Sequence, residues 1–310
     1  MELTRPILKF SDITKQIKYE KFMETAEFPH NIKGQLKLFL SEILFFDYIS
    51  FQKIVKNSKK KILIIYAGSS PGTHIKTIIK LFHSPKILWY LIDPRKTQVR
   101  FQDMTNIRIE LGYATKDWAK EIKKNYPDNL YDIILISDIR TVDEGKEVST
   151  KNLMEDYVIQ DGLVQELKPI WSSLKWRCPF PDDWHHDFNI YKGEEFLQAF
   201  ANKTSAEIRL FVSSKNTREE KKIITQKDAV EYEEKMAYYN HVLRKTPILG
   251  FNKKFPYHDY LYLTELISKL NRISFRKPTK LKGQLDIEEL TLIWEDYIFE
   301  ELRLKNYLDP

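Results

Sequence analysis

The chain has 310 residues, of which 42% are hydrophobic and 13% aromatic, so its composition excludes a natively unfolded protein. It carries 50 lysines and arginines against 44 aspartates and glutamates, and the net charge of +6 permits a polyanionic partner without requiring one. The single cysteine, Cys178, excludes an internal disulfide and a cysteine-based zinc site, and no apolar stretch reaches the ~20 residues of a membrane span, so we expect a soluble intracellular protein without a metal site.

The first predicted element is a helix over residues 34–56. Leu36, Leu40 and Ile43 recur there near helical spacing, which is typical of an amphipathic or largely buried helix. The lysine run that follows at 59–61 predicts an exposed turn.

Short apolar runs then alternate with helical patterns. Strands are predicted at 62–66, 87–92, 107–111, 133–136 and 208–212 and within 163–176, and helices at 74–83 and 115–125. This alternation is typical of an α/β fold with a mostly parallel central sheet and helices on both faces.

The remaining chain predicts a helical C-terminal part. Segment 215–222 is so polar that we expect a solvated loop, after which helical patterns cover 225–244, 259–270 and 286–305. No internal repeat and no linker rich in glycine, serine or proline interrupts the chain, so we expect a single domain over residues 1–310. Residues 1–33 then form an N-terminal extension, and residues 245–310 form a helical segment to which the sequence assigns no role.

The most informative block is the turn after the first predicted strand, in the run ILIIYAGSSPGTH. Gly68 and Gly72 let the backbone approach a ligand closely at the carboxyl end of a strand. No Gly-Lys-Ser/Thr follows, which excludes a P-loop. Asp93 ends the next strand 25 residues after Gly68, where an acidic residue binds a ribose diol in nucleotide-type cofactor sites. The Gly-x-Gly-x-x-Gly spacing of NAD sites is absent, so the pair favours a methyl donor of the S-adenosylmethionine type, with an ordinary strand-end turn as the alternative.

For three charged residues, the sequence is compatible with either a structural or a functional role. Asp138 follows a predicted strand and either caps a turn or faces the same crevice as Gly68. Lys175 lies among apolar and aromatic neighbours and either snorkels to water or points its ammonium into the crevice. Glu207 begins a strand in the same ambiguous way.

Seven blocks of the sequence together resemble one protein family. They are GQLKLFL, AGSSPGTHI, LIDPR, ILISDIR, SSLKWRCPFPD, SAEIRL and DAVEYEEKMAYYN, in this order from about residue 34 to residue 240. The blocks are similar to those of the poxvirus cap-specific mRNA nucleoside 2'-O-methyltransferases, which also serve as the small regulatory subunit of the viral poly(A) polymerase. The resemblance implies a Rossmann-like methyltransferase fold that uses S-adenosyl-L-methionine, with m7G-capped mRNA and a poly(A) polymerase catalytic subunit as partners. It also implies action in viral factories of the host cytoplasm and in virions.

The resemblance implies a catalytic Lys-Asp-Lys-Glu tetrad at Lys37, Asp138, Lys175 and Glu207. Methyl transfer to a ribose needs the 2'-oxygen in line with the methyl group and stripped of its proton as the bond forms. A free lysine is almost wholly protonated at neutral pH, so a lysine base needs neighbours that favour its neutral form. We expect Lys175 to be the base or the group that steers the hydroxyl, and Lys37 and the two carboxylates to tune and orient it.

The resemblance also implies two sets of binding residues. Those for the methyl donor are Tyr66, Gly68, Ser69, Pro71, Gly72, His74, Asp93, Arg95 and Asp138. Those for the cap and the transcript are Tyr19, Arg140, Arg177, Phe180, Asp182, Ser205, Arg209 and Glu233. In the second set, Phe180 and Tyr19 are expected to stack on the positively charged 7-methylguanine base. Asp182 and Glu233 are expected to accept hydrogen bonds from its edge.

Two other functions remain open on the sequence alone. One is an RNA-binding polymerase subunit that methylates caps weakly or not at all, and the presence of Thr204 where the family has an aromatic residue bears on cap affinity. The other is a methyltransferase of a small molecule or of uncapped nucleic acid, against which the set Phe180, Asp182 and Glu233 argues.

Overall fold

The computed structural model describes residues 5–20, 23, 34–101, 104–141, 148–217, 220–251, 256–278 and 287–302, with only the backbone of residues 216, 217, 287, 288, 290 and 291. Parts of the expected N-terminal extension (1–33) and C-terminal segment (245–310) therefore lie outside the described residues.

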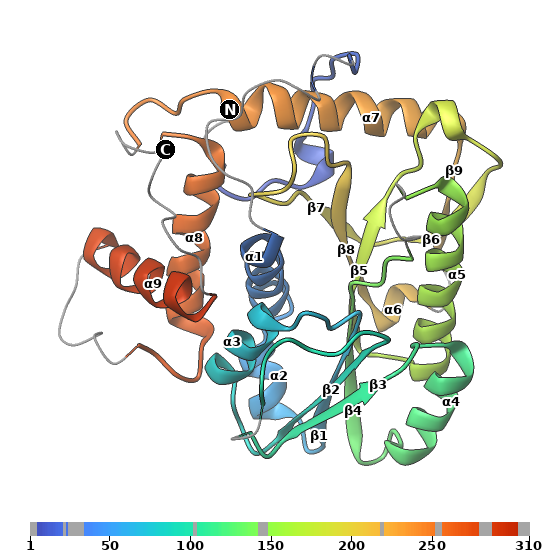
Figure 1. Ribbon diagram of the computed structural model, residues 1–310, viewed down its shortest axis with the longest axis vertical. Coiled ribbons are helices and arrows are strands. Elements are labelled where there is room, and N and C mark those ends of the chain that lie inside the picture. Colours follow the sequence, from blue (N-terminus) through green and yellow to red (C-terminus); the bar gives the residue numbers. More distant parts are fainter. Residues whose placement is uncertain are drawn as a thin grey trace.

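A seven-stranded sheet forms the centre of the fold (Figure 1). Five of its strands are parallel, namely β1 (Lys61–Ala67), β2 (Ile87–Asp93), β3 (Ile107–Leu111), β4 (Tyr131–Ser137) and β5 (Trp171–Arg177). Beside β5 lie the antiparallel strands β8 (Glu207–Ser213) and β7 (Glu194–Phe196), which gives the order β3-β2-β1-β4-β5-β8-β7. The predicted mostly parallel α/β sheet is confirmed. Its strand order reverses between β1 and β4, and ligands of such sheets bind in the crevice at that reversal.

Helices cover both faces of the sheet. One face carries α1 (Gly34–Tyr48), α2 (Phe51–Asn57), α3 (Thr73–Leu81), α8 (His258–Ile273) and α9 (Ile287–Glu301), and the other carries α4 (Lys116–Asn125), α5 (Thr150–Leu167) and α7 (Gln226–His241). Alternate residues of β1 supply the two cores, because successive side chains of a strand point to opposite faces. With both faces covered, the central strands are continuous apolar runs, which is why the sequence predicts them well.

Several short elements flank this sheet. The strands β6 (Phe188–Tyr191) and β9 (Lys221–Ile224) pair as a separate antiparallel ribbon, and α6 (Ser214–Thr217) follows β8. Three single turns of 3-10 helix are η2 (Phe10–Asp12), η4 (Pro181–Asp183) and η5 (Leu243–Lys245).

Several predicted boundaries are wrong, each for a local reason. The helix predicted over 34–56 is two helices, because Ser50 adopts a left-handed conformation (φ 52°) between α1 and α2. The apolar run within 163–176 joins the last turn of α5 to β5. The sequence does not predict the rest of α5 as a helix, because its apolar residues do not all lie on one face. Val158, for example, is 73% exposed. The segment predicted as a loop at 215–222 includes the end of α6 and the start of β9.

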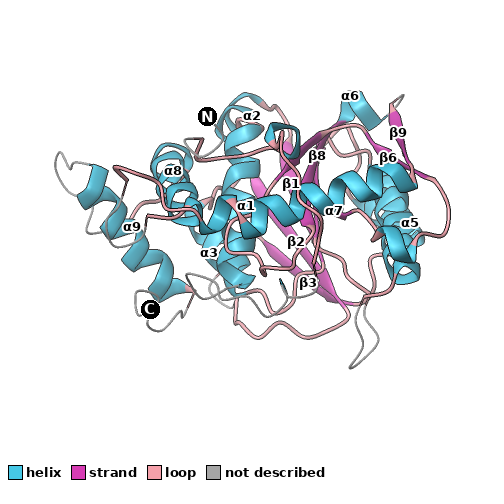
Figure 2. Ribbon diagram, turned by 90° about the horizontal axis from the view of Figure 1, so that it is seen from above, coloured by secondary structure: helices cyan, strands magenta, loops and turns pink. Residues whose placement is uncertain are grey.

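The C-terminal helices pack on the first face of the sheet. Helix α8 lies against α1, and α9 lies against α8 and α3 (Figure 2). Trp294, Ile298 and Leu302 of α9 are buried in the core of that face. Across the described part of the chain, no helix has both the length and the apolar character needed to cross a membrane.

Candidate active site

The crevice between β1 and β4 begins at the glycine turn. Gly68 and Gly72 have φ angles of +84° and +86°, which glycine adopts without strain. The amide of Gly68 donates to the carbonyl of Ile92, and the amide of Asp138 donates to that of Ala67, so the turn is joined to both neighbouring strands. A Cβ at Gly68 would lie 2.7 Å from the carbonyl carbon and oxygen of Asp138. Only glycine therefore lets these two loops touch.

We expect Gly68→Ala to lower both the free energy of unfolding and the affinity for the expected methyl donor more than the control substitution Gly250→Ala does. Alanine in a left-handed conformation costs about 1–2 kcal/mol, and the Cβ at Gly68 also collides with the backbone of Asp138. Gly250→Ala is the control, because Gly250 has φ +76° but nothing within 4 Å of its Cβ. Urea unfolding and titration with S-adenosylhomocysteine measure the two effects. Equal losses in the two variants would contradict a role for the collision.

The polar groups of the turn suit a nucleotide-type ligand. The hydroxyl of Ser69 is buried and has no hydrogen-bond partner among the described residues, which a bound polar ligand would relieve. Asp93 is 3% exposed and accepts from the amides of Ser70 at 3.0 Å and Arg95 at 2.8 Å. The Arg95 guanidinium reaches the same carboxylate at 3.2 Å, but its side chain is 74% exposed and can move aside for a ribose hydroxyl. Pro71 completes the turn and accepts from a backbone amide further along the chain.

Beneath the turn, Tyr66 and His74 are buried in a polar cluster. Tyr66 donates to Oε1 of Glu42 at 2.5 Å, and Nε2 of His74 lies 3.0 Å from both groups. Nδ1 of His74 lies 2.8 Å from Oε1 of Gln35. Burial and the nearby Glu42 raise the pKa of Tyr66 well above its usual value, so its hydroxyl stays a donor. Sequence reasoning missed Gln35 and Glu42, although polar residues on a largely apolar helix were a usable signal.

The structure brings the four expected tetrad residues together beside this turn. Nζ of Lys37, from α1, lies 2.7 Å from Oε1 of Glu207 at the start of β8. Lys175 of β5 lies between two carboxylates, with its Nζ 3.3 Å from Oδ1 of Asp138 and 3.5 Å from Oε2 of Glu207. The four side chains are between 11% and 16% exposed, so they are held firmly and still reach the surface of the crevice.

Both carboxylates of this cluster are ionised at neutral pH. Burial alone would raise the pKa of Asp138, but the charges of Lys175 and Arg209 outweigh it and lower that pKa to about 2. Burial opposes ionisation of Glu207 in the same way, and the charges of Lys175, Lys37 and Arg209 nevertheless lower its pKa well below the usual value. The carboxylates therefore hold the Lys175 ammonium in a fixed position.

We expect Glu207→Gln to lower the free energy of unfolding by an amount that is constant between about pH 5 and pH 8 and shrinks below about pH 4. A carboxylate whose folded pKa is depressed contributes stability above its unfolded pKa of ~4.3 and loses it as the pH falls toward the folded value. Urea unfolding of both proteins across this range measures the difference. If the difference in unfolding free energy between the two proteins instead grew as the pH fell, the cationic neighbours of Glu207 would not be lowering its pKa.

Arg209, which the resemblance implies as a contact of the cap or the transcript, instead lies below the tetrad and away from any surface that RNA could reach. Its side chain is 3% exposed, and its guanidinium donates to the carboxylate of Asp138 and, at 3.2 Å, to the carbonyl of Ser137. The amide of Gln198 stands 3.1 Å from both Oε1 of Glu207 and Nε of Arg209, with its nitrogen toward the carboxylate and its oxygen toward the guanidinium. Sequence reasoning missed Gln198, because a lone polar residue in a loop gives no periodic signal.

Two further arginines expected to contact RNA border the tetrad. Arg140 donates to Asp156 at 3.2 Å and lies 3.6 Å from Oε2 of Glu207, so it belongs to the charged cluster. The guanidinium of Arg177 lies 4.6 Å over the ring of Phe180. Its Nε is buried with no partner in the described part of the chain, and burial lowers the pKa of this arginine. A phosphate near Arg177 would supply both the missing acceptor and the missing charge.

Three residues expected at the cap lie near α7. Phe180 precedes η4, which contacts the start of α7 through a hydrogen bond from Gln226. Glu233 lies on α7, and burial together with the charge of Asp182 raises its pKa. Asp182 lies in η4, which directly follows Phe180, and η4 packs against α7, so the three residues belong to neighbouring elements.

Tyr19 and Ser205 approach the same helix from other parts of the chain. The amide of Ile17 donates to the carbonyl of Glu234, so the segment that ends near Tyr19 runs along α7. The carbonyl of Ser205 accepts from the side chain of Asn240 at 2.9 Å, and its hydroxyl accepts from the first amide of β8 at 3.2 Å. Ser205 therefore connects α7 to the strand that carries the tetrad glutamate.

Comparison with known proteins shows to which family this chain belongs. A family model described as "Poly A polymerase regulatory subunit" matches residues 2–289. A cap-specific mRNA (nucleoside-2'-O-)-methyltransferase of Fowlpox virus (strain NVSL) is 33% identical over 307 residues, which cover 98% of this chain and 96% of the relative. The protein of the same name from Myxoma virus (strain Lausanne) is 36% identical over 273 residues, or 86% of this chain and 78% of the relative.

One solved structure is a more distant match. A ribosomal RNA methyltransferase from Plasmodium falciparum has 15% identity and a TM-score of 0.33, over 54% of this chain and 95% of its own. A TM-score at that level supports no conclusion about this chain.

Proposed function

Because this chain belongs to the family of poly(A) polymerase regulatory subunits, we propose that it acts as a cap-specific mRNA 2'-O-methyltransferase. It transfers a methyl group from S-adenosyl-L-methionine to the ribose 2'-hydroxyl of the first transcribed nucleotide of m7G-capped RNA. One observation carries this proposal: the Lys175 ammonium lies between the carboxylates of Asp138 and Glu207, beside a glycine turn suited to a nucleotide-type donor.

The turn provides the groups that such a donor needs. When bound, S-adenosyl-L-methionine supplies an electrophilic methyl group on a positively charged sulfur. The Asp93 carboxylate would bind its ribose hydroxyls, and the unpartnered Ser69 hydroxyl would bind a polar group of the ligand. The absence of a side chain at Gly68 and Gly72 lets the ligand lie against the backbone.

The tetrad acts on the acceptor hydroxyl. Lys175 hydrogen-bonds the 2'-hydroxyl and orients it for in-line attack on the methyl carbon. For the proton transfer, its ammonium first releases a proton to solvent, and the resulting neutral amine takes the hydroxyl proton as the new C–O bond forms. Asp138 and Glu207 fix Nζ in one place, which in-line attack requires. Lys37 holds Glu207 from the other side, and Arg209 balances the charge of Asp138 from below.

The cap would bind along α7. Its 7-methylguanine base carries a positive charge, so the rings of Phe180 and Tyr19 suit its two faces and the carboxyl groups of Asp182 and Glu233 suit its edge donors. Arg177, whose Nε has no partner in the described residues, would take a phosphate of the transcript.

The test is transfer of labelled methyl to a short RNA that carries an m7G cap, an unmethylated G cap or no cap. We expect label in the 2'-oxygen of the first nucleotide with the m7G cap only. Equal labelling of uncapped RNA would instead indicate a methyltransferase of uncapped nucleic acid. Donor binding without any labelling would indicate an RNA-binding subunit that does not methylate caps.

The description of the matched family favours a second, compatible role. We propose that the chain also binds the catalytic subunit of a poly(A) polymerase and makes tail synthesis processive. Co-purification of the two subunits and tail lengths with and without this chain test the role, which fails if neither changes. The matched relatives are poxvirus proteins. We propose on this ground that the chain acts in the viral factories of the host cytoplasm and is carried in virions.

We expect Gln198→Met to lower kcat by about 10- to 100-fold with little change in the KM for the donor. Methionine has a similar length but cannot hold Glu207 and Arg209 at the same time, so the carboxylate that fixes Lys175 loses a restraint. Steady-state kinetics over a range of pH measure the effect, and Gln198→Glu is the second variant, since it keeps the acceptor for Arg209 but repels Glu207. If both variants keep the wild-type kcat, Gln198 only fills space in the fold and does not position Glu207 for the reaction.

A further inference from the structure

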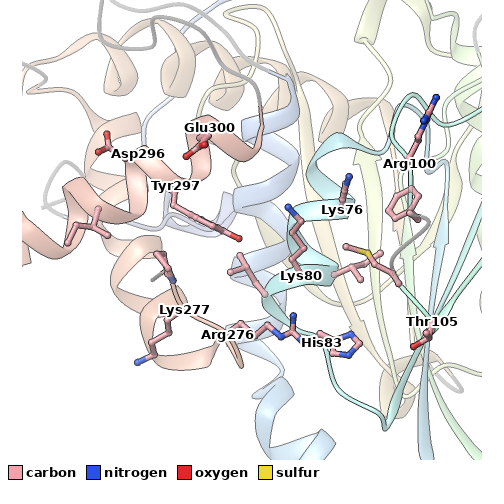
Figure 3. A pocket seen from close by; sticks show the side chains of 16 residues that line it. Lys76, Lys80, His83, Arg100, Thr105, Arg276, Lys277, Asp296, Tyr297 and Glu300 are labelled. Atoms are coloured by element: carbon pink, nitrogen blue, oxygen red, sulfur yellow. The ribbon is translucent and has the colours of Figure 1, made fainter. Parts of the chain in front are cut away.

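A cavity outside the methyl-transfer site separates α3 from α9. Its volume is about 670 Å³, and it is bounded by the outer side of α3, the chain that follows β2, the residues after α8, and α9 (Figure 3). Nζ of Lys80 lies 2.5 Å from Glu301 and ties α3 to α9, while the fully buried Trp294 and Ile298 anchor α9. The cavity is therefore held open by packed elements on both sides.

The two walls of the cavity carry opposite charges. Five cationic side chains line it from α3 and the two neighbouring segments, namely Lys76, Lys80, Arg100, Arg276 and Lys277. Lys80 is paired with Glu301, and within the described residues no carboxylate lies at ion-pair distance from the other four. The α9 wall carries Asp296 and Glu300. An uncompensated cationic wall of this kind attracts an anion.

Aromatic rings stand between the charged walls. Tyr297 projects from α9 toward Lys80 in Figure 3. Burial raises the pKa of Tyr297 to about 12, so its hydroxyl remains a hydrogen-bond donor at neutral pH. Phe101 is buried on the opposite side, where its ring would lie 3.7 Å from a Cβ at Gly72. Phe101 thus lies between the cavity and the glycine turn.

We propose that this cavity binds a nucleoside phosphate, with its phosphates on the cationic wall and its base on the α9 wall. Tyr297 offers a ring for stacking, and Asp296 and Glu300 accept from N–H groups on the edge of the base. A bare phosphate chain would satisfy the cations but leave these two carboxylates beside a like charge, whereas a base brings the donors they need. The volume falls within the ~300–1,000 Å³ of small-molecule pockets.

The same chemistry is available from two sources, a free nucleotide or one nucleotide of an RNA strand. Guanine presents two adjacent N–H donors to a carboxylate, so GTP is the probe of choice. The site lies apart from the tetrad and needs neither the donor nor the cap, so it goes beyond the proposed methyl transfer.

The test is calorimetric titration of the full chain with GTP, inorganic triphosphate and an uncapped oligoribonucleotide. Saturating S-adenosylhomocysteine fills the donor site throughout. We expect GTP to bind more tightly than triphosphate, and Lys76→Glu combined with Arg276→Glu to weaken GTP at least about tenfold. The control is Lys56→Glu combined with Lys59→Glu, which makes the same change in net charge at exposed positions outside the cavity.

Each outcome of the titrations decides the proposal. Competition between the oligoribonucleotide and GTP, or binding of the oligoribonucleotide alone that the cavity variant weakens, supports a nucleotide within RNA as the ligand. Binding of GTP alone supports a free nucleotide. The proposal is overturned if no probe binds, if the cavity variant binds GTP as tightly as wild type, or if triphosphate binds as tightly as GTP. Methyl transfer by the same variants is measured separately, so that failure of the proposed reaction is recognised as a different result.

Discussion

Lys175→Ala is expected to lower the rate of methyl transfer to capped RNA by at least about 10³-fold while donor affinity stays within about twofold. In the proposed mechanism, the substitution removes the group that orients the 2'-hydroxyl and takes its proton, and it leaves the glycine turn intact. It also removes the ammonium that Asp138 and Glu207 share, so the acceptor would meet a more negative site, although Arg209 and Lys37 still pair with the two carboxylates. Single-turnover rates and titration with S-adenosylhomocysteine separate the two effects.

Two further variants assign the role of Lys175. Lys175→Arg keeps the positive charge but cannot take up a proton, so we expect it to be nearly as slow as the alanine variant. Lys60→Ala is the matched control, because Lys60 also pairs with a carboxylate, Asp132 at 3.0 Å, but at the amino-terminal end of β1, opposite to the end that carries the glycine turn. Full activity of Lys175→Arg would limit Lys175 to electrostatic steering, and full activity of Lys175→Ala would remove it from the mechanism.

The strand ends were the most predictable part of the site. Gly68, Asp93 and Asp138 follow buried apolar strands, and parallel strands deliver their carboxyl ends to one edge of the sheet, so the pattern alone places the three residues together. Lys37 and Glu207 are different, because they are 170 residues apart and meet only when α1 crosses the sheet beside β8. Without the resemblance to a family, nothing local in the sequence pairs them.

Other features depend on burial, which the sequence does not display. The resemblance implies that Arg209 contacts the cap or the transcript, yet its side chain is buried beneath the carboxylates and balances the charge of Asp138. Gln198 and Glu42 satisfy buried partners that only the folded chain brings near them. The cavity beside α3 is likewise lined in part by α9. The sequence predicts a helix there but does not show against which elements it packs.

Asp259→Ala is expected to lower the free energy of unfolding by about 3–5 kcal/mol, because it removes the carboxylate that forms an ion pair with the buried guanidinium of Arg244. Both side chains are fully buried, and Arg244 donates to the Asp259 carboxylate through Nε at 2.9 Å and through its terminal nitrogen at 2.7 Å. Urea unfolding measures the loss. The double variant Arg244→Leu with Asp259→Ala removes both charges, so we expect it to lose less than the sum of the losses in Arg244→Leu and Asp259→Ala. Additive losses would show that the two residues do not act as a pair.

The same pair gives the C-terminal segment a part in the active site. Asp259 also accepts from the amide of Phe200 at 2.9 Å, and Arg244 also donates to the carbonyl of Ala201 at 2.8 Å. The start of α8 therefore fixes the loop that carries Gln198, two residues before Phe200, under the tetrad. At a temperature where Asp259→Ala is still folded, we expect a lower kcat and an unchanged affinity for S-adenosylhomocysteine, since the loop moves Glu207 but does not touch the glycine turn. Wild-type kcat in the folded variant would confine α8 to a structural role.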